Sequence, residues 1–288
     1  NQVKQLALGV QLYHAQANRL PPGAEGAVPA VPQPSTGPTD VNGSSWLVFI
    51  LPQIEAGNIQ YSRAVGYDSQ LNVGQNRVAT FYCPSGSKQA ATEGGESTHY
   101  YAIMGPGSAA GAVGVGTIFY SGTDGAYASV MGPGGAQGVT GMLIHYQNPA
   151  TIPSLPAYGR QGLLTLSDVT DGTSNTIMIG ERSVTEVNLQ SPCAGGSYRS
   201  WIRGNRYTGS AYVGTGAARN INHTQPPGTV DCYRGNNLND LPMASNHING
   251  ANFAMGDGSV RFITSQVNPG AYLAAATINN KEVALPLD

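Results

Sequence analysis

Residues 245–263 read SNHINGANFAMGDGSVRFI, and this stretch decides how the C-terminal part of the chain folds. Apolar residues alternate with small or polar ones on both sides of Gly256-Asp257-Gly258. Two alternating runs joined by Asp-Gly predict a β-hairpin, because both residue types tolerate the positive φ that a tight turn requires. We therefore expect a hairpin over residues 251–263, with Asp257 and Gly258 in a structural turn. His247 precedes the hairpin, and we expect it to anchor the hairpin by a hydrogen bond to the turn or to a neighbouring loop and not to bind a transition metal.

The composition restricts the class of protein. The chain has 288 residues, of which only 10% are charged, whereas a typical soluble protein has roughly a quarter. Its net charge is −2 and lysine occurs three times, so a basic surface that follows phosphates is excluded and no nucleic-acid partner is expected. The sequence contains no run of eighteen apolar residues that would span a membrane. Sparse charge with abundant Gly, Ser, Thr and Asn favours an extracellular protein.

The first segment, NQVKQLALGVQLYHAQANRL, has the pattern of an amphipathic helix. Apolar residues recur at steps of three and four positions, at Val3, Leu6, Val10, Tyr13 and Ala17. The helix is expected to end before Pro21, because proline disfavours helical geometry in the residue that precedes it. Asn1 either caps the helix or lies within a helix that continues upstream. We favour the second reading, in which residues 1–20 are the remnant of a longer, truncated helix.

Further elements follow from local patterns. The apolar run 46–51 is either a buried strand or a helix, and Pro52 suits the first position of a new helix. Residues 77–83 are predicted to form a strand that ends at Pro84, and residues 176–179 a buried strand. Ser167 is expected to cap one helical turn. A short helix is expected over 270–278.

No motif in the sequence defines a catalytic centre. The short Cys and His spacings of zinc sites and the GxSxG motif of serine hydrolases are both absent. The scattered glutamates favour no pair for glycoside hydrolysis. A cofactor is therefore not expected, although loop carboxylates at Asp168, Asp171 and Asp257 leave a calcium site as an alternative.

The cysteines are odd in number, at three. Cys193 and Cys232 are candidates for a disulfide that closes a loop of about forty residues, which would stabilise the fold by roughly 3–4 kcal/mol. Cys83 is then left over. It is either a buried free thiol or a residue whose partner lies outside this sequence.

Five blocks, in this order, resemble a large bacterial family that has a prepilin-type leader and a C-terminal His–nine residues–Asp-Gly signature and is abundant in planctomycetes. The blocks are NQVKQLALGVQLYHAQANRLPPG, SSWLVFILPQIEAGNIQY, FYCPS, LSDVTDGTSNTIMIGERS and HINGANFAMGDGSVRFI. The resemblance covers nearly the whole chain. Residues 105–160 and 186–243 are the variable, glycine-rich insertions, and residues 244–288 hold the hairpin and the C-terminal segment.

The resemblance implies an architecture and a location. Full-length members look like type IV pilins and type II secretion pseudopilins, in which a hydrophobic N-terminal helix precedes a globular head. It implies that Cys83 pairs with a cysteine just upstream of Asn1. The expected fold is a single pilin-like α+β domain over 1–288, with the N-terminal helix packed on an antiparallel sheet and with loop-rich β insertions.

The expected function is that of a non-enzymatic extracellular subunit of a type IV pilus or a type II secretion-like pseudopilus. Its partners would be other subunits, bound through the N-terminal helix, and its full-length form would be anchored in the inner membrane before assembly. The alternative is a surface module for carbohydrate binding or adhesion, with Trp201, Tyr198 and Tyr207 as residues that stack on sugars. A secreted hydrolase is the least favoured class.

Overall fold

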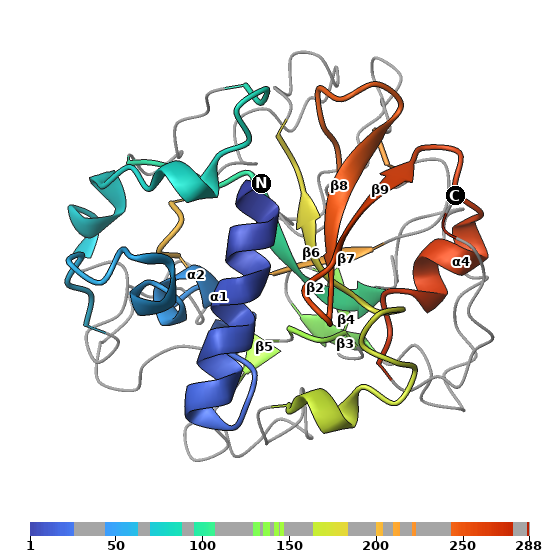
Figure 1. Cartoon of the computed structure of the whole chain (residues 1–288), viewed down its shortest axis with the longest axis horizontal. Coiled ribbons are helices and arrows are strands. Elements are labelled where there is room, and N and C mark those ends of the chain that lie inside the picture. Colours follow the sequence, from blue (N-terminus) through green and yellow to red (C-terminus); the bar gives the residue numbers. More distant parts are fainter. Residues whose placement is uncertain are drawn as a thin grey trace.

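In the computed structural model, the apolar stripe at the start of the chain produces helix α1 (Gln2–Ala17), as predicted (Figure 1). Val3, Leu6 and Val10 are buried in the core beneath it. Gly9 allows the close approach of α1 to the next segment, because a Cβ added there would lie 2.8 Å from Ile54 Cγ2. The helix ends at Asn18.

The structure describes a defined part of the chain. The described residues are 1–25, 44–62, 70–87, 95–106, 129–132, 135–138, 141–143, 145–146, 164–183, 200–203, 210–213, 221–222, 243–278 and 287. Most of the two predicted insertions therefore lies outside the described residues.

A five-stranded sheet forms the centre of the fold, in the order β7-β2-β6-β8-β9. Its strands are β2 (Tyr100–Pro106), β6 (Ile177–Glu181), β7 (Ser210–Val213), β8 (Gly250–Met255) and β9 (Val260–Thr264). The β2–β7 pair is parallel, and the other three neighbouring pairs are antiparallel. The combination of few helices with this sheet confirms the predicted α+β class.

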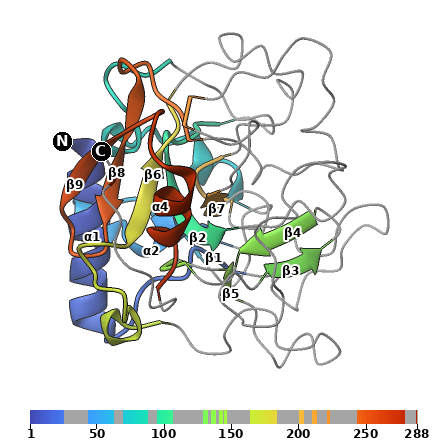
Figure 2. The ribbon, with the colours of Figure 1, turned by 90° about the vertical axis from the view of Figure 1, so that its right-hand side faces the viewer.

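Both faces of the sheet are covered. On β2, Tyr100 and Ala102 belong to the apolar core that contains α1, whereas Tyr101 and Ile103 belong to a second core that contains helix α4 (Pro269–Ala274). This division follows from the alternation of side chains along a strand. Figure 2 shows α1 and α4 on opposite sides of the sheet.

The predicted C-terminal helix is confirmed as α4, although it ends earlier than expected. Asn268 caps its first turn, because its Oδ1 accepts hydrogen bonds from the backbone N–H groups of Gly270 (2.8 Å) and Ala271 (3.1 Å). The ring of Tyr272 packs edge-on against Phe253, with ring centroids 5.8 Å apart. These contacts attach α4 to β8.

The predicted hairpin is confirmed as β8 and β9, joined by the turn Gly256–Ser259. Ala254 pairs with Val260, and the backbone N–H of Gly258 donates to the carbonyl of Met255 (2.9 Å). Of the two predicted turn residues only Gly258 has a positive φ, of 81°. Helix α1 holds the turn through Lys4 Nζ, which donates to the Gly258 carbonyl at 2.7 Å, and through Gln11, which donates to the Gly256 carbonyl.

Three local predictions are resolved or corrected by the structure. The apolar run after residue 45 is helical, as α2 (Trp46–Phe49), and Pro52 begins the 3-10 helix η1 (Pro52–Ile54) as expected. The strand predicted before Pro84 is wrong, since this segment forms the 3-10 helix η4 (Ala79–Phe81). There the Phe81 N–H donates to the Val78 carbonyl and closes a turn, which overrides the strand preference of the aromatic residues.

The helical turn predicted near Ser167 exists as the 3-10 helix η6 (Leu166–Asp168), but its cap is Thr165. The Asp168 carboxylate accepts from the backbone N–H of Thr165 (2.8 Å), and the Thr165 side chain accepts from the backbone N–H of Asp168, which together make a capping box. Short elements complete the described fold: β1 (Ala24–Glu25), η3 (Val73–Gln75), β3 (Ser129–Gly132), β4 (Gly135–Gly138) and β5 (His145–Tyr146).

Candidate functional site

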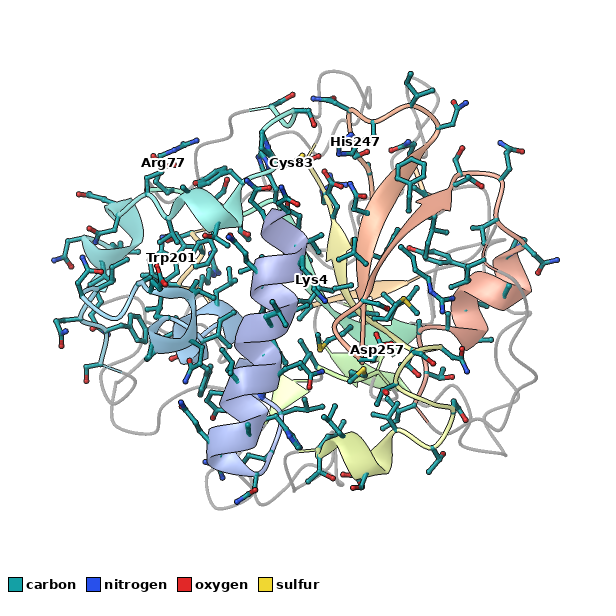
Figure 3. All side chains as sticks on the ribbon, in the orientation of Figure 1. Lys4, Arg77, Cys83, Trp201, His247 and Asp257 are labelled. Carbon is teal, nitrogen blue, oxygen red and sulfur yellow. The ribbon has the colours of Figure 1, made fainter. Side chains whose placement is uncertain are left out.

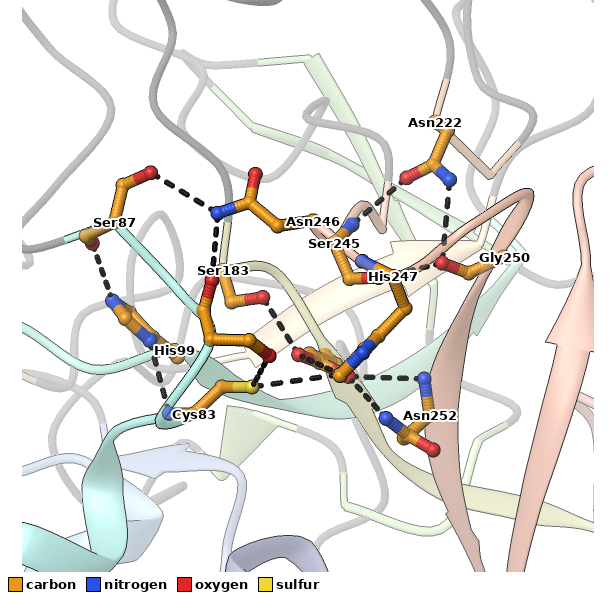
Figure 4. Close-up of polar contacts among 12 residues, drawn as sticks. Cys83, Ser87, His99, Ser183, Asn222, Ser245, Asn246, His247, Gly250 and Asn252 are labelled. Atoms are coloured by element: carbon orange, nitrogen blue, oxygen red, sulfur yellow. Dashed lines mark hydrogen bonds and ion pairs between the residues drawn. The ribbon is translucent and has the colours of Figure 1, made fainter.

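Three side chains with metal-ligating or nucleophilic atoms converge at one end of the central sheet. Cys83 follows η4, Glu181 ends β6, and His247 precedes β8. Figure 3 shows Cys83 and His247 close together, and Figure 4 shows the polar contacts that surround them. We refer to Cys83, Glu181 and His247 as the Cys-Glu-His cluster.

The cluster is centred on one ring nitrogen of His247. Its Nε2 lies 3.5 Å from Cys83 Sγ and 3.4 Å from Glu181 Oε1. One such atom from each of the three residues lies within 4.8 Å of the others. Cys83 and Glu181 are buried, whereas 33% of the His247 side chain is exposed, so His247 forms the solvent side of the cluster.

The position of Glu181 is fixed by hydrogen bonds to both carboxylate oxygens. The Ser183 hydroxyl donates to Oε1 at 2.6 Å. Asn252 donates to Oε2 from its backbone N–H (3.1 Å) and from its side-chain Nδ2 (2.8 Å). A fully buried carboxylate is costly without such donors, and here they also aim Oε1 at His247.

The position of Cys83 is fixed by a buried histidine, His99. The backbone N–H of Cys83 donates to His99 Nδ1 at 3.1 Å, so Nε2 carries the ring proton and donates to the Ser87 carbonyl at 2.9 Å. Burial lowers the pKa of His99, which keeps this imidazole neutral. The pKa of the neighbouring Tyr100 is also raised above its usual range, mainly by burial and to a smaller extent by the charges of Glu181 and Cys83.

The loop that carries His247 is tied to the start of β8. The His247 N–H donates to Ser245 Oγ at 3.0 Å, and that hydroxyl donates to the Gly250 carbonyl at 2.6 Å. Asn222 supports the same loop by accepting from the Ser245 N–H (2.8 Å). Asn246 donates to the Ser85 carbonyl at 2.8 Å, which joins this loop to the one that follows Cys83.

The geometry does not fit a cysteine–histidine–carboxylate catalytic triad. In a triad the nucleophile and the carboxylate contact different nitrogens of the imidazole, so that the carboxylate orients the ring while the other nitrogen takes the proton. Here Sγ and Oε1 both approach Nε2. A nitrogen, an oxygen and a sulfur atom that lie this close together instead resemble the ligands of one metal ion.

The two halves of the predicted C-terminal signature, His247 and Asp257-Gly258, lie at opposite ends of β8 and have different roles. His247 lies at the beginning of β8, and Asp257 and Gly258 lie in the turn beyond its other end (Figure 3). His247 bonds to a neighbouring loop, as one of the two predicted options, and makes no bond to the turn among its described contacts. The Asp257 carboxylate accepts from the Ser259 N–H at 2.8 Å, which is a structural role in the turn.

The three aspartates proposed for calcium occupy separate turns. Asp168 belongs to the η6 capping box and Asp257 to the hairpin turn. The backbone of Asp171 donates to the Ile278 carbonyl (3.2 Å) and accepts from Asn175 Nδ2 (3.2 Å). Within the described residues, three ligand-type side chains come together only in the Cys-Glu-His cluster. The calcium site stays a prediction.

The residues predicted to stack on sugars are placed only in part. Trp201 is 1% exposed, packs on Phe81 with ring centroids 5.2 Å apart, and donates from Nε1 to the Asn76 carbonyl at 3.0 Å. It is therefore a core residue and not an open stacking surface, which corrects its predicted role. Tyr198 and Tyr207 lie outside the described residues, as do the candidate disulfide partners Cys193 and Cys232.

Cys83 is a free, buried thiol in the described structure, which agrees with one of the two options. It lies near the N-terminal end of α1 (Figure 3), and η4 packs against that helix. Its pairing with a cysteine upstream of Asn1 stays a prediction. The sequence contained a signal for the cluster, because Cys83, Glu181 and His247 each lie within a block that the family resemblance uses, but their spacing gave no reason to group them.

The fold and the cluster together define a class: an α+β domain with helices on both faces of a mostly antiparallel sheet and a buried polar cluster at one end of it. Within the described residues, no helix combines the length and the apolar character that a membrane span requires. The chain belongs to a family described as protein of unknown function (DUF1559), whose model matches residues 1–270. Comparisons with curated proteins and with solved structures found no match.

Proposed function

We propose that the chain is a non-enzymatic extracellular subunit of a type IV pilus or of a type II secretion-like pseudopilus. In this proposal the described fold is the head of the subunit, and the N-terminal helix joins it to other subunits. A segment upstream of α1 anchors the protein in the inner membrane before assembly.

The observation that carries the proposal is the outer face of α1. The inner face packs on the sheet through Val3, Leu6 and Val10, yet Leu8 and Leu12 on the outer face are 45% and 51% exposed. Exposed Ala15 extends the same stripe, since positions four and three apart lie on one side of a helix. A helix with apolar residues on both faces is suited to pack on a sheet and on another helix at once.

The position of α1 on the sheet supports the same proposal. The helix covers β6 and β8 from one side, and its polar side chains Lys4 and Gln11 bind the hairpin turn. These bonds fix the orientation of the helix relative to the head. A fixed orientation is what a repeating filament needs, because each subunit must present its head in the same direction.

The proposal is tested with the full-length protein in its host bacterium. Surface filaments are sheared from cells, and the protein in the filament fraction is measured by immunoblot and located by immunogold electron microscopy. We expect the wild-type protein in filaments. The double substitution Leu8→Gln with Leu12→Gln should lower its amount there by at least about tenfold, because two leucines lose their buried contacts.

The matched control is Ile248→Gln. Ile248 is 86% exposed and apolar, but it lies in the loop before β8 and not on α1. Its substitution should leave assembly unchanged. Equal assembly of the double variant, or retention of the wild-type protein inside the cell, would contradict the proposal.

A further inference from the structure

We infer that the Cys-Glu-His cluster is a binding site for a divalent metal ion of the zinc type, with three protein ligands and one open position. The ligands are Cys83 Sγ, Glu181 Oε1 and His247 Nε2. The inference is independent of the proposed function, because it rests on the cluster and not on helix α1.

The distances between the three atoms match those between ligands of one tetrahedral ion. Zinc bonds of 2.0–2.3 Å at tetrahedral angles place neighbouring N, O and S ligands about 3.3–3.6 Å apart. The observed separations are 3.4 Å for Nε2 to Oε1 and 3.5 Å for Nε2 to Sγ. The third pair is within 4.8 Å, so a small side-chain rotation completes the set.

The charges of the ligands favour a divalent cation in the Cys-Glu-His cluster. A thiolate and a carboxylate contribute two negative charges, which a divalent ion neutralises. Both residues are buried, and the Cys83 thiol gives up its proton when it binds the ion, so the charges of the two side chains are balanced in the bound state. The sulfur ligand excludes calcium and magnesium, which prefer oxygen, and the combination of thiolate, imidazole and carboxylate is typical of zinc.

Residues around the cluster supply the outer contacts that metal sites require. Asn252 and Ser183 orient the carboxylate, and His99 holds the backbone of Cys83 (Figure 4). Such partners set the direction of each ligand before the ion binds. The exposed side of His247 opens the fourth position to solvent, so the bound ion can take a water molecule or one external ligand.

The test uses the 288-residue chain, reduced, stripped with a chelator and titrated with Co²⁺ and then with Zn²⁺. Four-coordinate Co²⁺ with a thiolate ligand gives intense visible bands and a sulfur-to-metal charge-transfer band in the near ultraviolet, and Zn²⁺ displaces both. We expect one equivalent of metal per chain. Cys83→Ser should abolish the charge-transfer band, and His247→Gln should weaken binding by more than about 100-fold, which exceeds the usual loss for an outer contact.

Two further variants separate ligation from folding. Asn252→Ala should weaken metal affinity by about 10- to 100-fold while the charge-transfer band persists at saturation. His14→Gln is the matched control, because His14 lies on α1 and accepts from the Leu166 N–H, away from the cluster. Its metal affinity should equal that of the wild-type chain. Circular dichroism confirms that each variant is folded.

Two outcomes would overturn the inference. One is a chain that gives no charge-transfer band, or one whose band survives Cys83→Ser. The other is full-length protein from the host in which mass spectrometry finds Cys83 in a disulfide, since a disulfide sulfur is not a thiolate ligand. The disulfide result would support the pairing implied by the family resemblance, and it would leave the filament experiment unaffected.

Discussion

The two ends of strand β8 differ in how they are built. At the Asp257 end, the chain turns within four residues, and helix α1 contributes two donors to the turn carbonyls. At the His247 end, side chains from three distant segments meet in a buried polar cluster. One end is determined mainly by neighbours in sequence, and the other by the arrangement of the whole sheet.

This difference predicts unequal sensitivity to substitution. A tight turn loses little when one exposed contact is removed, because water replaces the lost hydrogen bond. A buried cluster loses more, because each remaining donor or acceptor is left without a partner. Four experiments on metal-free protein in chelator compare the stability that each end of β8 loses, from the largest expected effect to the smallest.

The largest effect is expected from Glu181→Leu. The substitution leaves the Asn252 N–H, its Nδ2 and the Ser183 hydroxyl without their buried acceptor. We expect the free energy of unfolding, measured with urea, to fall by about 3 kcal/mol. Glu181→Gln keeps acceptor capacity and should cost less than half as much. Equal stability of the leucine variant and wild type would show that the carboxylate does not organise this end.

Gly250→Ala should have the next largest effect. An added Cβ would clash with the carbonyl oxygen of Ile263 and would lie 2.6 Å from Phe262 Cζ. The ring can rotate away, but the carbonyl belongs to the β8–β9 ladder, so we expect a loss of about 2 kcal/mol by urea unfolding. If Gly250→Ala lost less stability than Gly258→Ala in the hairpin turn, the proposed order of the two ends would be reversed.

Gly258→Ala tests the turn itself. An added Cβ would clash with nothing, because its nearest neighbour, Gln11 Cγ, would lie at an ordinary contact distance of 3.7 Å, so the cost comes from the φ of 81°. We expect a loss of about 1 kcal/mol in thermal or urea unfolding. Gly258→Asn is the matched control and should cost less, because Asn adopts positive φ more readily. Identical losses for both variants would mean that φ is not the cause.

The smallest effect is the pH dependence that comes from Asp257. Partial burial acts to raise the pKa of Asp257, but hydrogen bonds from Ser259 and the charges of Arg261 and Lys4 outweigh it and hold the pKa below its usual value. Because the pKa is lower in the folded state, the stabilisation is present above pH of about 4 and is lost as the pH falls through the lowered value.

The expected contribution of Asp257 is below about 0.5 kcal/mol, since the side chain is exposed and its charges are screened. Thermal melts of wild type and Asp257→Asn between pH 3 and 6 measure it, and the wild-type melting temperature should fall slightly more on acidification. A steeper fall for the variant would contradict the sign of the shift.

The same contrast explains what the sequence could predict. The hairpin and α1 follow from periodicity and turn chemistry, and β6 from a short apolar run, and all of these are local properties. The helix α4 was likewise predicted from its local sequence. The prediction of a strand before Pro84 failed because the Phe81 N–H donates to the Val78 carbonyl and closes a turn. Strand propensity alone does not predict such a bond. The choice between strand and helix for residues 46–51 needed the neighbouring core, because a short apolar run suits either.

The candidate site could not be predicted for a related reason. Cys83 was assigned as a leftover thiol, Glu181 as one of several acids, and His247 as an anchor. Only the strand order β2-β6-β8 brings their segments side by side, and strand order is a property of the complete fold. For Trp201 the error is of another kind. Its neighbours in sequence suggested an exposed aromatic surface for sugar stacking, but its ring lies in the core.

The separation of the cluster residues along the chain has a consequence for biogenesis. Cys83 and His247 are 164 positions apart, and Glu181 lies on β6, the strand that β8 must join before the cluster can close. The nascent chain therefore lacks the complete cluster until β8 has been synthesised and has docked on β6, and such long-range pairings form slowly. Formation of this cluster would thus mark the docking of β8 onto β6, and a spectroscopic signal from it would report that step of folding.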